Sequence, residues 1–137
     1  MSAPLAVTEQ TLQQVLQNVA CTRQYGFRLH AIEEGSCTLH VPFQPLFERP
    51  GGIISGQVFM AAADVAMWLA IMTRLGATDM SVTSDITTAF LRGAKREDFQ
   101  CTATILKLGR RLIYGVAECV STDHQRLTHH TVTYMRT

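Results

Sequence analysis

The strongest constraint in this sequence is a stretch of about twenty residues, Gly56–Leu75, that is apolar around nearly its whole circumference. The spacing of its side chains predicts one helix that stops at Gly76, because glycine readily adopts the conformation that ends helices. Almost its only polar side chains are those of Gln57, Asp64, Thr73 and Arg74. Such a helix must be covered on several sides, and a strongly curved antiparallel sheet wrapped around it can do this.

The segments around this helix supply the strands of such a sheet. Runs of β-branched and aromatic residues predict strands over 27–33, 36–41, 82–90, 99–108, 112–120 and 127–135. Turn residues join the first two at Glu34-Gly35, and we expect the later strands to form an antiparallel meander. Residues 8–20 have helical spacing, with Thr8 as the N-cap, and residues 42–56 form an irregular stretch with three of the four prolines. This order indicates an α+β fold.

Length and composition predict one domain over residues 1–137, with a helical segment over about 1–24 and a core over 25–136. The chain is 47% hydrophobic and 17% charged, and no repeat or Pro/Ser-rich linker interrupts it. Its formal net charge of +1 provides no global field for nucleic acid. The most apolar stretch, Val58–Met72, carries Asp64 and is shorter than the ~20 residues that a bilayer needs, so we expect no membrane span.

Cysteine and histidine usage favours a cytoplasmic protein without a metal site. The four cysteines are widely spaced and no secretory signal precedes them, so we expect free thiols; they are Cys21, Cys37, Cys101 and Cys119. His129 and His130 are adjacent on an expected strand and point to opposite faces, so they cannot bind one metal ion together.

Three segments resemble the PaaI-like acyl-CoA thioesterases, the hotdog-fold family that includes the 4-hydroxybenzoyl-CoA thioesterase type. At the start of the long helix, ISGQVFMAAADVA (54–66) is similar to the family motif H-G-G, six residues, then an acidic residue. The segment 82–92 resembles the next family strand, whose end commonly reads F-L-R-P, and 103–111 with 131–134 resemble the last strands. The likeness covers about residues 25–136.

The resemblance implies roles for particular residues. Ser55 aligns with the family histidine, Gly56 and Gln57 with its two glycines, and Asp64 with the catalytic acid. Arg49 stands where several members place Asn or Gln, so Arg49, Ser55 and Gln57 are departures at expected substrate-binding positions. The resemblance further implies a single hotdog domain that hydrolyses an acyl-CoA thioester without a cofactor.

Thioester hydrolysis needs a donor for the carbonyl oxygen and a carboxylate that activates water or attacks directly. Gly56 begins the helix, where free amide groups and the helix dipole favour developing negative charge. Asp64 lies in an apolar helix, where an unpaired carboxylate costs several kcal/mol. The alternatives are that Gly56 only shapes a turn, and that Asp64 is a structural carboxylate satisfied by amides or an arginine.

Thr83 aligns near a family Ser/Thr that orients the attacking water. Regular alternation puts Val82, Ile86 and Phe90 on one face of the strand, and Thr83 on the other with Asp85 and Thr87. An ordinary strand threonine is the alternative.

Two basic clusters near strand ends are candidates for binding the phosphates of coenzyme A; they contain Arg92, Lys95, Arg96, Lys107, Arg110 and Arg111. The alternative is that these are solvated charges at turns.

Spacing along the helix predicts an oligomer. Gly56 and Asp64 are eight residues apart, which is about 12 Å along a helix, whereas a catalytic hydrogen bond spans about 3 Å. If both act on one carbonyl, they come from two protomers, and we expect a homodimer or homotetramer with active sites at the dimer interface. Two other functions stay open: an acyl-CoA-binding hotdog protein without turnover, and a hydratase of the same fold, which lacks a suitably placed histidine.

Overall fold

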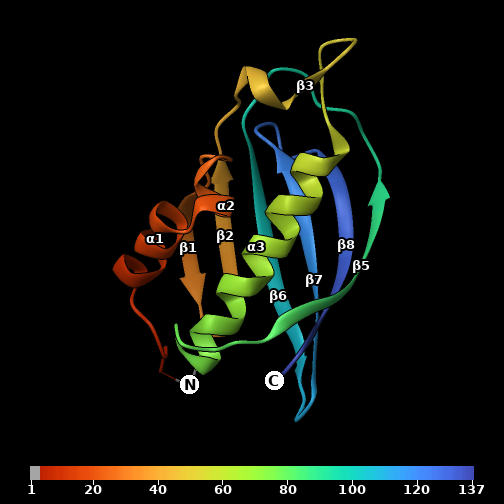
Figure 1. The fold of residues 1–137 in the computed structure, drawn as a ribbon. Coiled ribbons are helices and arrows are strands. Elements are labelled where there is room, and N and C mark those ends of the chain that lie inside the picture. The colour runs from red at the N-terminus through yellow and green to blue at the C-terminus, as the bar shows by residue number, and fades with distance from the viewer. Residues whose placement is uncertain (1–3) are drawn as a thin grey trace.

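The computed structural model describes residues 4–137 and consists of a curved antiparallel sheet wrapped around one long helix, α3 (Gly56–Leu75) (Figure 1). The sheet has six strands in the order β1-β2-β6-β7-β8-β5. Their bounds are β1 Arg28–Glu33, β2 Ser36–Val41, β5 Val82–Phe90, β6 Phe99–Leu108, β7 Leu112–Ser121 and β8 Arg126–Met135. The remaining elements are α1 Glu9–Asn18, α2 Ala20–Arg23, a 3₁₀ turn at Pro45–Phe47, β3 Glu48–Arg49 and β4 Ile53–Ile54. The expected α+β fold is confirmed.

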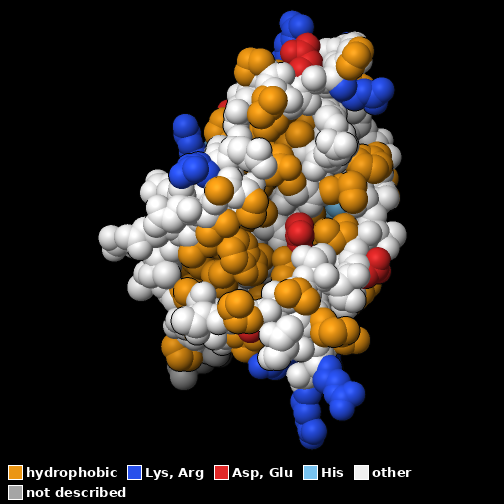
Figure 2. All heavy atoms as spheres, in the orientation of Figure 1, with side chains coloured by type: hydrophobic (Ala, Val, Ile, Leu, Met, Phe, Trp, Pro, Cys, Tyr) orange, Lys and Arg blue, Asp and Glu red, His pale blue; other side chains and the backbone are white. Residues whose placement is uncertain are grey.

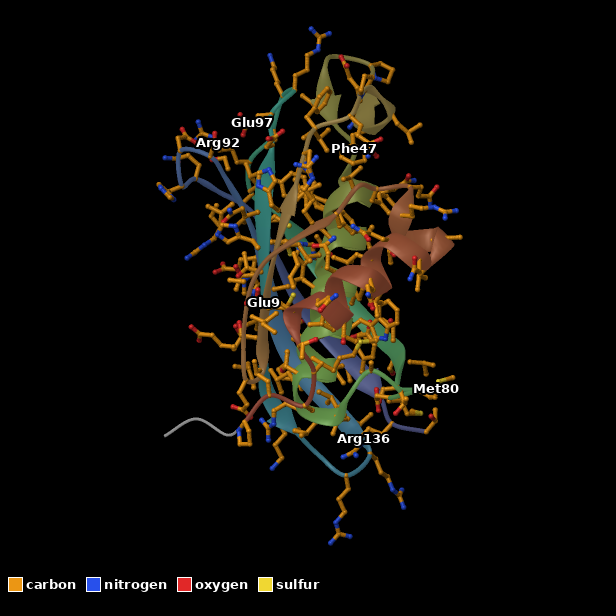
Figure 3. All side chains as sticks on the ribbon, turned by 90° about the vertical axis from the view of Figure 1, so that its left-hand side faces the viewer. Glu9, Phe47, Met80, Arg92, Glu97 and Arg136 are labelled. Carbon is orange, nitrogen blue, oxygen red and sulfur yellow. The ribbon has the colours of Figure 1, made fainter. Side chains whose placement is uncertain are left out.

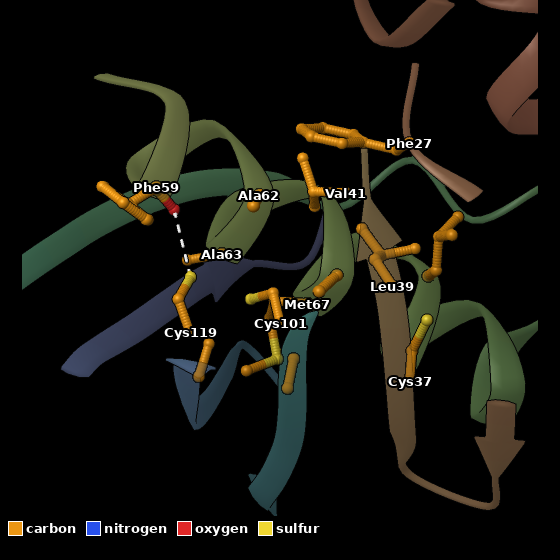
Figure 4. Close-up of a cluster of buried hydrophobic side chains, with 14 of the residues drawn as sticks. Phe27, Cys37, Leu39, Val41, Phe59, Ala62, Ala63, Met67, Cys101 and Cys119 are labelled. Atoms are coloured by element: carbon orange, nitrogen blue, oxygen red, sulfur yellow. Dashed lines mark hydrogen bonds between the residues drawn. The ribbon is translucent and has the colours of Figure 1, made fainter. Parts of the chain in front are cut away.

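The core lies between α3 and the concave face of the sheet. Ala62, Ala63 and Ala66 are fully buried, and their small side chains let the helix approach the strands closely. Phe59 and Phe99 fill the space near the N-terminal end of α3, with ring centroids 4.8 Å apart; Figure 4 shows Phe59, Ala62 and Ala63 within the buried cluster. By length and composition α3 could cross a membrane, but 61% of its most apolar stretch of 18 residues is buried inside this fold. Packing against the sheet therefore accounts for its hydrophobicity.

The C-terminal end of α3 is anchored to the turn between β1 and β2. Gly76 has a φ of 91°, which a side-chain-bearing residue rarely adopts, so the helix ends there as predicted. Near this end, the Gly35 amide donates to Thr73 Oγ1 at 2.8 Å and Arg74 pairs with Glu34 at 2.6 Å. The turn between β1 and β2 is thereby attached to the last turn of the helix.

The N-terminal helix α1 covers one edge of the sheet. Thr8 is its N-cap and accepts a hydrogen bond from the Thr11 amide, as the sequence predicts. Leu12 and Leu16 are buried, and the Gln13 side chain accepts from the Leu29 amide of β1 at 3.1 Å. The amphipathic helix therefore packs against β1, to the left of the sheet in Figure 1.

Two expectations about β5 are wrong. Strands β6, β7 and β8 form a meander, but β5 pairs with β8 at the far edge and not with β6. A bulge between Thr83 and Asp85 also shifts the register, so Thr83 lies opposite Tyr134. Directly paired residues share a face, so Thr83 points inward with Ile86, whereas Asp85 points outward and Val82 is 52% exposed.

Gly115 on β7 allows close packing of α3 on the sheet, and its substitution tests this packing. A Cβ at Gly115 would lie 2.5 Å from the Thr104 carbonyl oxygen and would overlap the Met67 side chain. We therefore expect Gly115→Ala to destabilise the fold by about 1–3 kcal/mol. Denaturant unfolding measures this, with Gly93→Ala as control because a Cβ at Gly93 meets nothing within 4 Å. Equal stability of the two variants would contradict this account of the packing.

Candidate active site

The sheet leaves one stripe of α3 incompletely covered. Between Val58 and Thr73, five residues at helical spacing are partly exposed and the others are buried; the five are Met60, Ala61, Asp64, Val65 and Trp68. Asp64 is the only ionisable residue of this stripe. The carboxylate therefore stands half-buried on an otherwise apolar surface that faces the space between α3 and β5.

Two hydroxyl groups hold Asp64 through the same carboxylate oxygen. Tyr134 on β8 donates to Oδ1 at 2.7 Å, and Thr83 on β5 donates to Oδ1 at 2.8 Å. Burial raises the pKa of Tyr134 well above its ordinary value, and the negative charge of Asp64 raises it further. The phenol therefore remains a donor. Within residues 4–137, Oδ2 accepts no hydrogen bond and is left to other partners.

A cavity of about 480 Å³ adjoins this carboxylate. Its apolar wall includes Val65, Trp68, Met80 and Val82, and Cys21 and Thr22 of α2 close one side. Figure 2 shows hydrophobic side chains spread over this face of the molecule across α3, with most Lys and Arg side chains toward its periphery. Asp79, whose Oδ2 accepts a hydrogen bond from the Ser81 amide, also lines the cavity. The arrangement places the Asp64 carboxylate beside a largely apolar wall that suits an apolar group.

A second cavity of about 380 Å³ lies at the N-terminal end of α3. Gly56, Phe90, Arg49 and Arg92 contribute to its lining. A Cβ at Gly56 would lie 2.9 Å from the Phe90 ring, so a side chain at this position would have to displace that ring. The Gly56 amide has no intrahelical acceptor, and none of the residues described accepts a hydrogen bond from it. This cavity therefore joins a free helix amide to two guanidinium groups.

The structure does not bring Gly56 and Asp64 together within one chain. The two cavities share no lining residue. Strand β5 links them, because Thr83 near its start lines the Asp64 cavity and Phe90 at its end lines the Gly56 cavity.

The other predicted site residues are dispersed. Ser55 is the N-cap of α3 but makes no capping hydrogen bond through its side chain, and Gln57 is exposed on the first turn. Arg110 and Arg111 form the exposed turn between β6 and β7 and line neither of these two cavities. Their turn adjoins Arg136, which donates to the Gly109 carbonyl at 3.1 Å. Figure 3 shows Arg92 and Arg136 at opposite ends of the molecule.

Sequence reasoning assigned no role to Tyr134. The signal lies in the alternation of the closing strand, which places Thr128, His130, Val132 and Tyr134 on the buried face. A tyrosine at the end of such a row needs a partner for its hydroxyl group. Identifying Asp64 as that partner requires the tertiary structure, because the two residues are 70 positions apart.

The cysteines and histidines form no metal site in the part of the chain that the structure describes. All four cysteines are free thiols. His130 is fully buried between Thr88 and Thr128, with its Nε2 4.0 Å from Cys119 Sγ. Burial raises the pKa of the Cys119 thiol, but its hydrogen bonds outweigh this effect and lower the pKa to about 6. The hydrogen bond with Cys101 contributes most to the lowering. This cluster lines neither the Asp64 cavity nor the Gly56 cavity.

Comparison with known proteins identifies a matching family and several relatives of this chain. The sequence profile of the thioesterase superfamily matches residues 51–128. A crystal structure from Silicibacter titled as a "putative thioesterase" is 29% identical, with a TM-score of 0.86 over 96% of this chain and 92% of that chain. The E. coli PaaI protein shares the fold at 19% identity, with a TM-score of 0.84 over 93% of this chain and 91% of that one.

A curated relative from Saccharolobus solfataricus, named "Putative esterase SSO2140", is 29% identical over 92 residues. That match covers 67% of this chain and 65% of the relative, so the chain spans just under two thirds of its length.

Proposed function

The chain belongs to the thioesterase superfamily, and from this premise we propose that it hydrolyses an acyl-coenzyme A to the free acid and coenzyme A. The observation that carries the proposal is the Asp64 carboxylate, held by Tyr134 and Thr83 at the edge of an apolar cavity. The cavity takes the acyl group, and the thioester carbonyl then lies beside the carboxylate.

Two routes use this arrangement. In the first, Asp64 removes a proton from water as the water oxygen bonds to the carbonyl carbon; the C–S bond then breaks and the leaving thiolate receives that proton. In the second, a carboxylate oxygen attacks the carbonyl carbon and the thiolate leaves; water then hydrolyses the resulting anhydride, which regenerates the carboxylate and supplies the proton that the thiolate takes up. Both routes need a donor for the oxyanion, and the free amide of Gly56 at the N-terminus of α3 is suited to that role.

A second copy of the chain solves the separation of the two cavities. β5 is an edge strand whose outer edge is unpaired among residues 4–137, and Val82 and Phe90 at its ends are 52% and 58% exposed. A long exposed edge of this kind favours pairing with another strand. Antiparallel pairing of β5 with its counterpart about a twofold axis would set the Thr83 end of one strand beside the Phe90 end of the other. Asp64 of one protomer and Gly56 of its partner would then meet.

The nucleotide of coenzyme A needs cationic partners for its phosphates. Arg49 and Arg92 line the Gly56 cavity, so in the proposed dimer they stand beside the thioester site and are the first candidates. Arg110 and Arg111 lie beside Arg136, at the opposite end of the molecule from Arg92, and are the second candidates for binding the phosphates.

The carboxylate distinguishes hydrolysis from simple binding. Among residues 4–137, no histidine lines the Asp64 or Gly56 cavity, so a hydratase would lack its usual base. A binding protein would show saturable affinity for acyl-CoA without releasing thiol. A panel of CoA thioesters of different acyl length, assayed by thiol release, separates hydrolysis from binding.

Asp64→Asn tests the proposed mechanism. The amide oxygen of asparagine can accept the same two hydrogen bonds, but the group is neither basic nor nucleophilic. We expect kcat to fall by about 10²-fold or more with KM within a few-fold, and the thermal midpoint to hold or rise. Glu33→Gln, a carboxylate-to-amide change at an exposed position of β1 that lines neither cavity, is the matched control. An Asp64→Asn variant that melts early yet turns over normally per folded molecule would remove Asp64 from the mechanism.

Mixing two impaired chains tests the shared site. Gly56→Val forces a side chain against Phe90, and Asp64→Asn removes the carboxylate. A mixed dimer of these chains has one intact site, so a statistical mixture should recover about a quarter of wild-type activity. The measurement is thiol release after co-refolding, with each variant refolded alone as control. Mixtures no more active than the parent variants, or an active monomer in light scattering, would contradict the geometry.

The two arginine pairs differ in their expected effect on substrate affinity. Arg49→Ala with Arg92→Ala should raise KM for acyl-CoA by about tenfold with little change in kcat, because phosphate contacts act on binding. Activity on an acyl thioester of N-acetylcysteamine, which lacks the nucleotide, should not change. Added salt should imitate the double variant. If Arg110→Ala with Arg111→Ala produces this pattern instead, the β6–β7 turn holds the phosphates.

A further inference from the structure

We propose that Tyr134 is a positioning residue that commits Asp64 to react through Oδ2. The inference rests on the proposed thioester hydrolysis and extends it to a residue outside the helix motif. Its starting point is the asymmetry of the carboxylate: both protein donors, Tyr134 and Thr83, bond to Oδ1.

The position of Tyr134 is set by the core of the protein. Its side chain is 4% exposed, and Val132, two residues earlier on the same strand face, is fully buried. Besides its 2.7 Å contact with Oδ1, the hydroxyl oxygen lies 3.0 Å from the backbone carbonyl oxygen of Asp64. The phenol has one proton, and the shorter contact identifies the carboxylate as its acceptor. The hydroxyl group therefore contacts both the backbone and the side chain of the residue it orients.

Thr83, on the neighbouring strand, donates the second hydrogen bond to the Asp64 carboxylate. It lies opposite Tyr134 in the β5–β8 ladder, and the bulge before Asp85 turns its hydroxyl inward. Thr83 is exposed on an edge strand, whereas Tyr134 is buried in β8. Tyr134 is thus the more rigid of the two donors, and Thr83 the assisting one.

Two donors on Oδ1 reduce its capacity to accept a further proton or to attack carbon, because its lone pairs are engaged. Oδ2 keeps its lone pairs. In the base route Oδ2 takes the proton of the attacking water and returns it to the leaving thiolate. In the nucleophile route the new C–O bond forms to Oδ2 as the C–S bond breaks. Either step depends on the carboxylate plane that Tyr134 holds.

Tyr134→Phe tests the proposal because it keeps the ring and removes only the hydroxyl. We expect kcat, measured on the pH-independent plateau, to fall by about 10- to 100-fold, since small misplacements of a reacting group have effects of this size. KM should stay within a few-fold. Tyr114→Phe, on the outer face of β7 and 42% exposed, is the matched control and should behave as wild type. Replacing Tyr134 with 4-aminophenylalanine, which retains a donor at that position, should restore part of kcat.

A loss of thermal stability in Tyr134→Phe with unchanged plateau kcat per folded molecule would overturn the proposal and leave Tyr134 a structural residue. Failure of 4-aminophenylalanine to restore any kcat would count against it equally. A second measurement does not depend on turnover: the ¹³C carboxyl resonance of Asp64, assigned by its loss in Asp64→Asn, should shift in Tyr134→Phe and not in Tyr114→Phe. If the wild-type protein releases no thiol, the proposed hydrolysis fails; the resonance still decides whether Tyr134 holds the carboxylate.

Discussion

The burial of α3 is the constraint on which the rest of the structure depends. An apolar helix of twenty residues is stable in water only if most of its surface is covered, because each buried apolar side chain contributes about 1.5–3 kcal/mol. The curved sheet supplies that cover, and small residues such as Ala62 and Ala66 let strands approach the helix axis. Gly115 continues the same close packing from the side of the sheet. What the sheet does not cover is a single stripe, and the site is built on it.

The half-buried carboxylate of Asp64 is the feature that the stripe makes chemically useful. In an apolar setting its charge would be costly without partners, and two hydroxyl groups on adjacent strands supply them. Their donation to one oxygen offsets the cost of burial and leaves the other oxygen available. The same two contacts therefore connect the stability of the half-buried carboxylate to the proposed chemistry.

The edge strand β5 connects the two parts of the proposed site and offers a surface for pairing with a second chain. It begins at the cavity of Asp64 and ends at that of Gly56, with one edge unpaired in the described chain. A single copy separates the proposed base from the proposed oxyanion donor. Pairing of two such edges about a twofold axis would close the unpaired edge and join the halves of the site in one step, and this is why the proposed function requires more than one chain.

The sequence by itself determined the elements that depend on local patterns. The bounds of α3, the cap at Thr8, the strands and the position of Asp64 on an apolar helix follow from periodicity and capping, which act over a few residues. Tertiary structure alone decided that β5 lies beyond β8, that a bulge turns Thr83 inward, and that Tyr134 reaches Asp64. It also divided the arginines, placing Arg92 at the Gly56 cavity and the β6–β7 turn elsewhere. The reason is that strand order, register and cavities arise from contacts between distant residues, and regular alternation along one strand cannot reveal where that alternation is broken.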